Sequence, residues 1–228
     1  MHRAVRHGAI LWIVAVLEFV GGMIVAQLAW TNPRYSLTQN VISDLGAIHC
    51  QMVGSRHVCS PLHSVFNGSL IVAGIVLILG LLLLRSALPR KRPATVGIGL
   101  LVVSSLGAIG VGLFPEDYLL PAHLLSAFLA FAGGNLAVLF IGLAMRSDRH
   151  WGRGWSVYSV GSGLVGLAAL GLIVVRAYDW GGFFSAWGEG GIERTIAAPI
   201  FLWVFVAGLR LARLPTYAPH ELPQPTAR

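Results

Sequence analysis

Charged residues are scarce in this sequence, and their scarcity excludes an ordinary soluble domain. Asp, Glu, Lys and Arg make up 11% of the 228 residues, whereas soluble domains contain about 25% of these residues. Hydrophobic residues make up 56% of the chain, and the mean hydropathy is +0.75. This composition is typical of an integral membrane protein.

Polar interruptions divide the chain into apolar segments long enough to cross a membrane, since a spanning helix needs about 20 apolar residues. We predict an all-α integral membrane fold, a six-transmembrane-helix bundle over residues 1–213 with short outward loops. An irregular cytoplasmic tail over 214–228 should follow it. The first span is longer than a signal-peptide core, so we expect it to be retained. The predicted spans cover residues 8–30, 62–84, 94–114, 122–145, 155–175 and 192–212.

The basic residues predict how the bundle is oriented. Twelve of the sixteen Lys and Arg would lie on the face that carries both termini. The positive-inside rule therefore places both termini in the cytoplasm and three loops outside, in the cell inner (plasma) membrane. Because insertion accounts for the net charge of +7, we expect membrane lipid as a partner and no nucleic acid. The outward face would hold the other four basic residues, Arg34, Arg56, Arg176 and Arg194.

Cysteine is almost absent, with Cys50 and Cys59 alone in the chain. Both lie in the first outward loop, on the oxidising side, which predicts a structural disulfide. A metal site that adds His49 and His57 is the alternative, but the C-x8-C spacing is not a zinc pattern.

Recognised catalytic motifs are also absent, because the sequence contains neither H-E-x-x-H nor G-x-S-x-G. Its informative polar residues nevertheless fall on the outward side. Polar groups at membrane depth are costly unless they face protein or water, so these residues predict an outward polar pocket. The candidate ligand-binding residues are Tyr35, Ser36, Asn40, Ser43, Asn67, Asp117, Glu193 and Arg194.

Two interpretations of the remaining polar residues stay open. In the first, Asp44, His63, Glu116 and His123 supply acid and base groups for a membrane-embedded hydrolase. His63, His123 and Asp44 could then hold a divalent metal as cofactor. In the second, Asp44 caps a turn and the histidines bond to loop carbonyls, so that all of these residues are structural.

Three classes of function follow from this topology. The leading hypothesis is recognition or processing of a lipid-like or small amphiphilic ligand at the outer membrane surface. The alternative is a non-catalytic subunit or assembly factor that binds a membrane protein partner. An ion or solute transporter is less favoured, because the spans offer few polar residues beyond Glu18, Gln27 and Asn135.

The start of the second span carries a local signal. Ser60 followed by Pro61 is typical of an N-cap and a proline at the first helical position. We therefore expect Ser60 to cap this helix.

Several short stretches of the sequence form a recognisable set. They are Tyr35-Ser36, Asn40, Ile42-Ser43-Asp44-Leu45-Gly46, His63 to Asn67, Phe114-Pro115-Glu116-Asp117 with His123, and Glu193-Arg194. Together they resemble the integral-membrane family catalogued as domain of unknown function 998. The resemblance covers roughly residues 8 to 212 and implies about six spans, as in this family in bacteria and archaea. It implies no activity, and the Cys50 to Cys59 loop and Glu18 look like features of this sequence alone.

Overall fold

The computed structural model describes residues 2–54, 56–177 and 187–213. The tail predicted over 214–228 lies outside the described residues. Each of the six described helices is long and apolar enough to cross a membrane, which confirms the all-α multi-pass fold. The helices are α1 (His2–Ala29), α2 (His63–Leu84), α3 (Arg92–Leu113), α4 (Leu120–Met145), α5 (Gly152–Ala177) and α6 (Gly188–Ala212).

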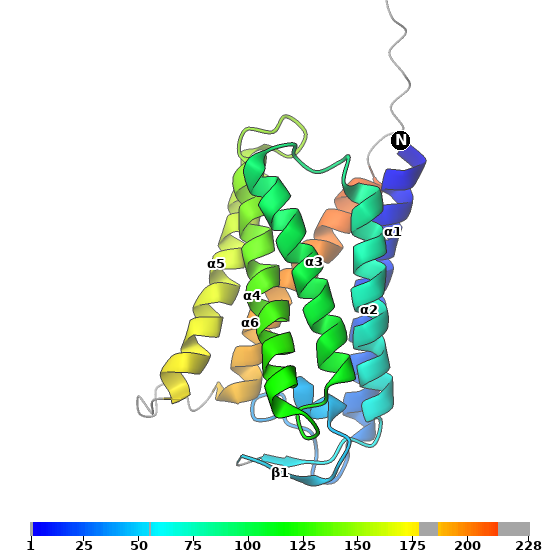
Figure 1. Ribbon diagram of the computed structural model, residues 1–228, viewed down its shortest axis with the longest axis vertical. Helices are drawn as coiled ribbons and strands as arrows, with labels where there is room; N and C mark the ends of the chain where they lie inside the picture. The colour runs from blue at the N-terminus through cyan, green and yellow to red at the C-terminus, as the bar shows by residue number, and fades with distance from the viewer. Residues whose placement is uncertain (1, 55, 178–186, 214–228) are drawn as a thin grey trace, which may run out of the picture.

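The helices pack into a ring in chain order, and Figure 1 shows them running along the long axis of the molecule. Each helix packs against the next, α6 packs against α1, and α4 also contacts α6 across the ring. The start of α1 and the end of α6 lie at the same end of the bundle, here named the terminal end. The opposite end, here named the hairpin end, carries loop one (residues 30–62) and the loop 114–119. The placement of both described chain ends together agrees with the predicted topology, whereas their cytoplasmic location stays a prediction.

Loop one contains the short structured elements of the hairpin end. A 3-10 helix, η1 (Ser43–Gly46), precedes two antiparallel strands, β1 (Gln51–Val53) and β2 (Arg56–Val58). Met52 pairs with His57 in this β-hairpin, which lies beyond the helix ends in Figure 1. Cys50 and Cys59 flank the hairpin and form the predicted disulfide.

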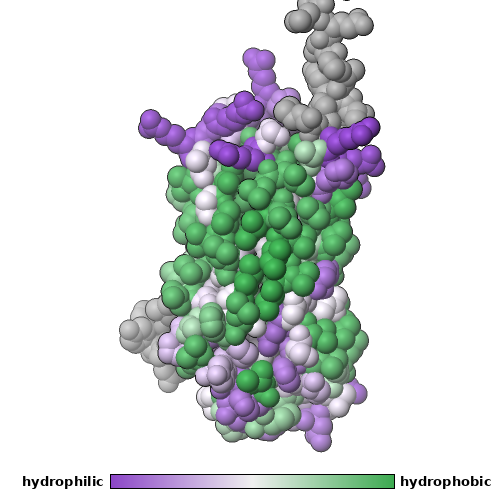
Figure 2. Space-filling view, turned by 45° about the vertical axis from the view of Figure 1, so that its right-hand side comes forward, coloured by the Kyte–Doolittle hydropathy of each residue, from purple (hydrophilic) through white to green (hydrophobic). Residues whose placement is uncertain are grey.

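The exterior fits a membrane environment. Figure 2 shows hydrophobic side chains over the middle of the visible face and hydrophilic side chains gathered at both ends. Large apolar side chains such as Leu17, Leu82 and Leu125 are 57%, 64% and 60% exposed. Exposed apolar surface on this scale requires a membrane to cover it.

The half of the bundle near the terminal end is filled by a packed core. Trp12 and Trp203 are fully buried, and their ring centroids lie 5.9 Å apart. The Trp12 indole N–H donates to the Leu77 carbonyl at 3.2 Å, and that of Trp203 donates to Ser159 Oγ at 2.8 Å. The indole N–H groups of Trp12 and Trp203 therefore both have the hydrogen-bond partner that burial demands.

Helix ends differ from the sequence prediction. Ser60 does not cap α2: the N-cap is Leu62, without a side-chain cap, and Ser60 Oγ donates to the Leu45 carbonyl at 2.7 Å. The hydroxyl is used to hold η1 against the start of α2. α1 and α6 also extend several residues beyond their apolar segments, because backbone hydrogen bonding continues where hydropathy falls.

Candidate functional site

An ion pair between Asp44 and Arg56 forms the centre of the polar cluster at the hairpin end. Arg56 Nε lies 3.2 and 3.0 Å from the two Asp44 carboxylate oxygens, and Nη2 lies 3.0 Å from Oδ1. Asp44 also accepts hydrogen bonds from Asn40 Nδ2 at 2.9 Å and from the Val41 N–H at 3.1 Å. The Asp44 side chain is 0% exposed, so its charge is compensated by these partners.

Arg56 also links two further acids to this cluster. Its Nη1 pairs with Glu189 at the start of α6, and its Nη2 lies 3.9 Å from Glu116 Oε2. Neither Arg56 nor Glu189 was among the residues predicted for the site. A signal was present, since several buried acids need a cation and Arg56 lies inside the disulfide loop beside them.

Glu116 differs from the other acids in its protonation. Burial raises the pKa of Glu116 to about 9, and the neighbouring Asp44 adds to the rise, while Ser43 and Arg56 oppose it. The raised pKa favours the protonated form of Glu116, and protonation weakens its 3.9 Å ion pair with Arg56. Ser43 Oγ donates to Oε2 at 3.0 Å, and the buried Oε1 has no partner among the described residues. The Oε1 atom of Glu116 is thus left with hydrogen-bonding capacity to spare.

Loop one is anchored on the start of α6. The Ile42 N–H donates to the buried Glu193 carboxylate. Arg194 Nη1 donates to the carbonyls of Leu37 and Asn40, both at 2.9 Å, and Nη2 donates to the Tyr35 hydroxyl at 2.6 Å. These bonds join residues more than 150 positions apart and close loop one over the bundle.

Close backbone packing supports the same contact. The Gly190 N–H donates to the Thr38 carbonyl at 2.9 Å. A Cβ at Gly190 would lie 2.1 Å from the Asn40 carbonyl oxygen, so only glycine fits there. Within loop one, the Ser36 N–H donates to Asn40 Oδ1 at 3.0 Å. These contacts hold loop one in one position over the hairpin end of the bundle.

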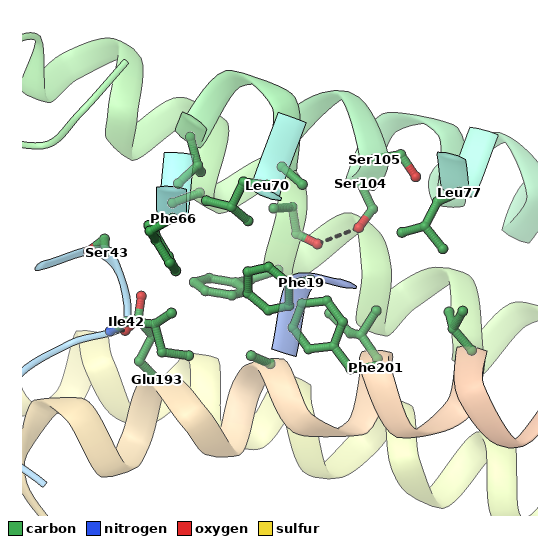
Figure 3. Close-up of a pocket in the computed structure, with 18 of the residues that line it drawn as sticks. Phe19, Ile42, Ser43, Phe66, Leu70, Leu77, Ser104, Ser105, Glu193 and Phe201 are labelled. Carbon is green, nitrogen blue, oxygen red and sulfur yellow. Dashed lines mark hydrogen bonds between the residues drawn. The ribbon is translucent and has the colours of Figure 1, made fainter. Parts of the chain in front are cut away.

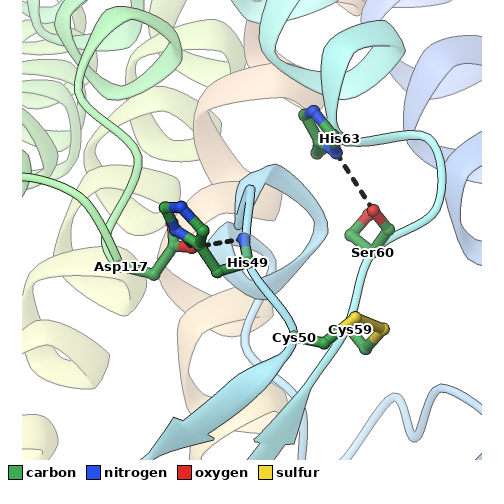
Figure 4. The surroundings of a disulfide bond; sticks show 6 residues. All are labelled: His49, Cys50, Cys59, Ser60, His63 and Asp117. Atoms are coloured by element: carbon green, nitrogen blue, oxygen red, sulfur yellow. Dashed lines mark hydrogen bonds and ion pairs between the residues drawn. A yellow bond between two sulfur atoms is a disulfide. The ribbon is translucent and has the colours of Figure 1, made fainter.

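Asn67 and Asp117 fasten loop one to other elements. Asn67 Nδ2 donates to the Gly46 carbonyl at 2.9 Å. Asp117 accepts from the Ile48 N–H at 3.1 Å and lies 3.0 Å from His49 Nδ1. Figure 4 shows Asp117 against His49, next to the disulfide.

The two candidate histidines occupy different environments. His63 Nδ1 lies 3.1 Å from the Ser60 carbonyl (Figure 4), and His63 does not line the cavity described below. His123 is buried, and its Nδ1 lies 2.9 Å from the Phe114 carbonyl. Because a carbonyl only accepts, Nδ1 carries a proton, and in the neutral imidazole Nε2 keeps its lone pair.

Beneath the polar cluster lies a mainly apolar cavity of ≈ 70 Å³. Figure 3 shows the rings of Phe19, Phe66 and Phe201 along it, Ser43 and Glu193 at one end, and Leu77 at the other. His123 also lines it. The predicted polar residues thus bond largely to one another, and the open space below them is apolar. From Phe66 to Leu77 the cavity runs eleven residues along α2, about 16 Å at the rise of an α-helix.

The residues predicted to bind a divalent metal do not form a ligand cluster in the described part of the chain. Among the described residues, no group of three or more His, Cys, Asp or Glu lies close enough to hold a metal ion. The metal role of His63, His123 and Asp44 therefore stays a prediction without a ligand cluster to support it. Asp44 is already occupied by Arg56, and His63 by a backbone carbonyl.

Comparisons with known proteins place the chain in a family. No curated protein and no solved structure matches it. A family model described as "Protein of unknown function (DUF998)" matches residues 13–210. These residues include the whole polar cluster and every residue that lines the cavity. The chain therefore belongs to the DUF998 family of multi-pass membrane proteins.

Proposed function

We propose that the protein binds a lipid-like amphiphile, with a hydrocarbon chain in the cavity and a polar head at the hairpin end. The observation that carries this proposal is the shape of the cavity, which is apolar along its length and polar only near its ends. Its length of about 16 Å is roughly half the 30 Å hydrocarbon core of a membrane. A chain entering from one leaflet would reach this depth if the cavity, ≈ 70 Å³ without a ligand, widens around it.

The polar end of the cavity can recognise a head group. Ser43, His123 and Glu193 line it there, and Ser43 connects it to Glu116. These groups offer a hydroxyl, an imidazole nitrogen and carboxyl oxygens, so they suit a head with hydroxyl or amine groups. Positive-inside charge would place this end on the outer surface of the plasma membrane.

Processing of the ligand is the extended form of this proposal. In a hydrolase, His123 Nε2 would act as general base and protonated Glu116 as general acid. Asp44 and His63, the other candidates, would act as positioning residues through Arg56 and Ser60. Hydrolysis of a bound ester that is lost in both His123→Gln and Glu116→Gln would support this form, whereas binding without turnover would restrict the protein to recognition.

The test is to fill the cavity. Ala108 on α3 lines it, so Ala108→Leu should displace the hydrocarbon chain. Ala168→Leu makes the same change at an exposed position of α5. Mass spectrometry of the purified proteins should find a bound single-chain amphiphile in wild type and Ala168→Leu, with at least about tenfold less in Ala108→Leu, the effect of 1.4 kcal/mol.

Equal lipid content in all three proteins would overturn the proposal. A partner protein that co-purifies at fixed stoichiometry with both wild type and Ala108→Leu would favour the subunit or assembly-factor alternative.

A further inference from the structure

A second groove lies at the terminal end, opposite the proposed ligand cavity and independent of it. It is formed by the end of α2, the connection 85–91 and the start of α3, with a volume of ≈ 940 Å³. Four cationic side chains line it: Arg85, Arg90, Lys91 and Arg92. All four are exposed.

These cations lack an acidic counterpart in the described part of the chain. No ion pair there involves any of the four. The first turn of α3 contains no acidic residue, and Lys91 Nζ donates to the neutral Ser147 hydroxyl. Four clustered positive charges without an internal anion favour an external one.

The part of the groove wall formed by the spanning helices is largely apolar. Leu82, Leu83, Val96 and Ile98 line it below the cations. Leu82 is 64% and Val96 is 49% exposed, and both belong to membrane-spanning helices. A ligand in this groove therefore meets positive charge at one end and hydrocarbon-compatible surface at the other.

We propose that this groove binds an anionic phospholipid, with its phosphate at Arg85, Arg90, Lys91 and Arg92 and an acyl chain along Leu82 and Val96. Basic pockets between spanning helices are suited to anionic head groups. The insertion signal accounts for basic loops in general, but it requires no groove with apolar walls. The connection 146–151 provides the comparison, because Arg146 and Arg149 are exposed at the same end and do not line this groove.

The experiment measures binding of phosphatidylglycerol and phosphatidylcholine to the full chain in detergent by native mass spectrometry. Phosphatidylglycerol should bind wild type at least about tenfold more tightly. Arg85→Gln/Arg90→Gln should weaken that binding about 30-fold, since each surface cation contributes about 1 kcal/mol to anionic-lipid attraction. Arg146→Gln/Arg149→Gln removes the same charge and should change binding less than about threefold, within the scatter of surface effects.

Charge-conserving Arg85→Lys/Arg90→Lys should keep most of the affinity, which separates loss of charge from loss of fold. Equal weakening by the two Gln pairs would show diffuse attraction and overturn the site. Equal binding of the two lipids would overturn it as well. Soluble glycerol phosphate that binds as tightly as phosphatidylglycerol would identify free phosphate as the ligand and overturn the lipid assignment.

Discussion

Arg56 is the residue on which the hairpin end depends most. It contacts three acids, Asp44, Glu116 and Glu189, which come from loop one, the loop 114–119 and α6. Of these, only Asp44 has a side chain that is 0% exposed and pairs with Arg56 through two carboxylate oxygens. A charge in that position is costly when its partner is removed.

Arg56→Gln should lower the free energy of unfolding by about 3 kcal/mol, because it leaves Asp44 buried without a cation. The measurement is thermal unfolding in detergent, with Arg34→Gln as the control. Arg34 is an exposed arginine of the same loop, and Arg34→Gln should leave the unfolding midpoint nearly unchanged. The double variant Asp44→Asn/Arg56→Gln should recover part of the lost stability, since it removes the unpaired charge. Equal unfolding midpoints for Arg56→Gln and Arg34→Gln would contradict this account.

Glu116 should make stability depend on pH. Its pKa rises from 4.5 to about 9 on folding, mainly through burial. The folded state therefore favours the protonated form, and this contribution is lost as pH rises from 4.5 towards 9. Glu116→Gln cannot ionise and should show a flatter decline of the unfolding midpoint between pH 5 and pH 9. Glu189→Gln, at a side chain that is 44% exposed, should keep the wild-type slope. Parallel curves for wild type and Glu116→Gln would rule out this role.

The β-hairpin positions Arg56, and the disulfide closes that hairpin at its base. Cys50 precedes β1 and Cys59 follows β2, with Arg56 as the first residue of β2. The hairpin is short, and short two-stranded hairpins are at best marginally stable in water. The covalent link therefore contributes to holding the central cation of the cluster.

Cys50→Ser/Cys59→Ser should destabilise the protein by roughly 2 to 3 kcal/mol in the chain-entropy model of a short disulfide loop. Limited proteolysis should then cleave within 50–59 faster than in wild type, and reductant should lower the unfolding midpoint of wild type alone. A midpoint in wild type that does not respond to reductant would show that the loop is held by its hydrogen bonds.

The helices were predictable as elements, but their ends were not. Each span is recognised by its run of about 20 apolar residues, a local property that does not depend on contacts with other segments. Ser60 shows where local signals fail: its hydroxyl bonds to Leu45, fifteen residues earlier, in place of capping α2. A tertiary contact of this kind competes with the cap and cannot be read from neighbouring residues.

For the bundle as a whole, the two ends have different characters. The half near the terminal end is packed by Trp12, Trp203 and their neighbours, and the cavity runs from the hairpin end up to this core, where Leu77 lines it. Asn135, one of the polar residues within the spans, donates to the Ile196 carbonyl at 3.1 Å and joins α4 to α6. This division favours a binding site reached from one leaflet.

Orientation in the membrane follows from charge and can be tested by labelling. A membrane-impermeant thiol reagent should modify Cys50 and Cys59 in intact cells only after reduction, because the hairpin end is predicted to lie outside. A Ser86→Cys variant in the Cys50→Ser/Cys59→Ser background should be labelled only after the membrane is opened. Labelling of Ser86→Cys in intact cells would reverse the topology.

Composition and hydropathy alone were sufficient for the six spans, the disulfide and the set of polar residues at one end. They could not identify Arg56 as the centre of that set, separate His63 from the cavity, or show that the open space is apolar. The reason is distance along the chain: Ser43 meets Glu116 73 residues later, and Ile42 meets Glu193 151 residues later. Apolar length acts within one segment, whereas the partner of a buried charge is decided only when six helices bring distant loops together.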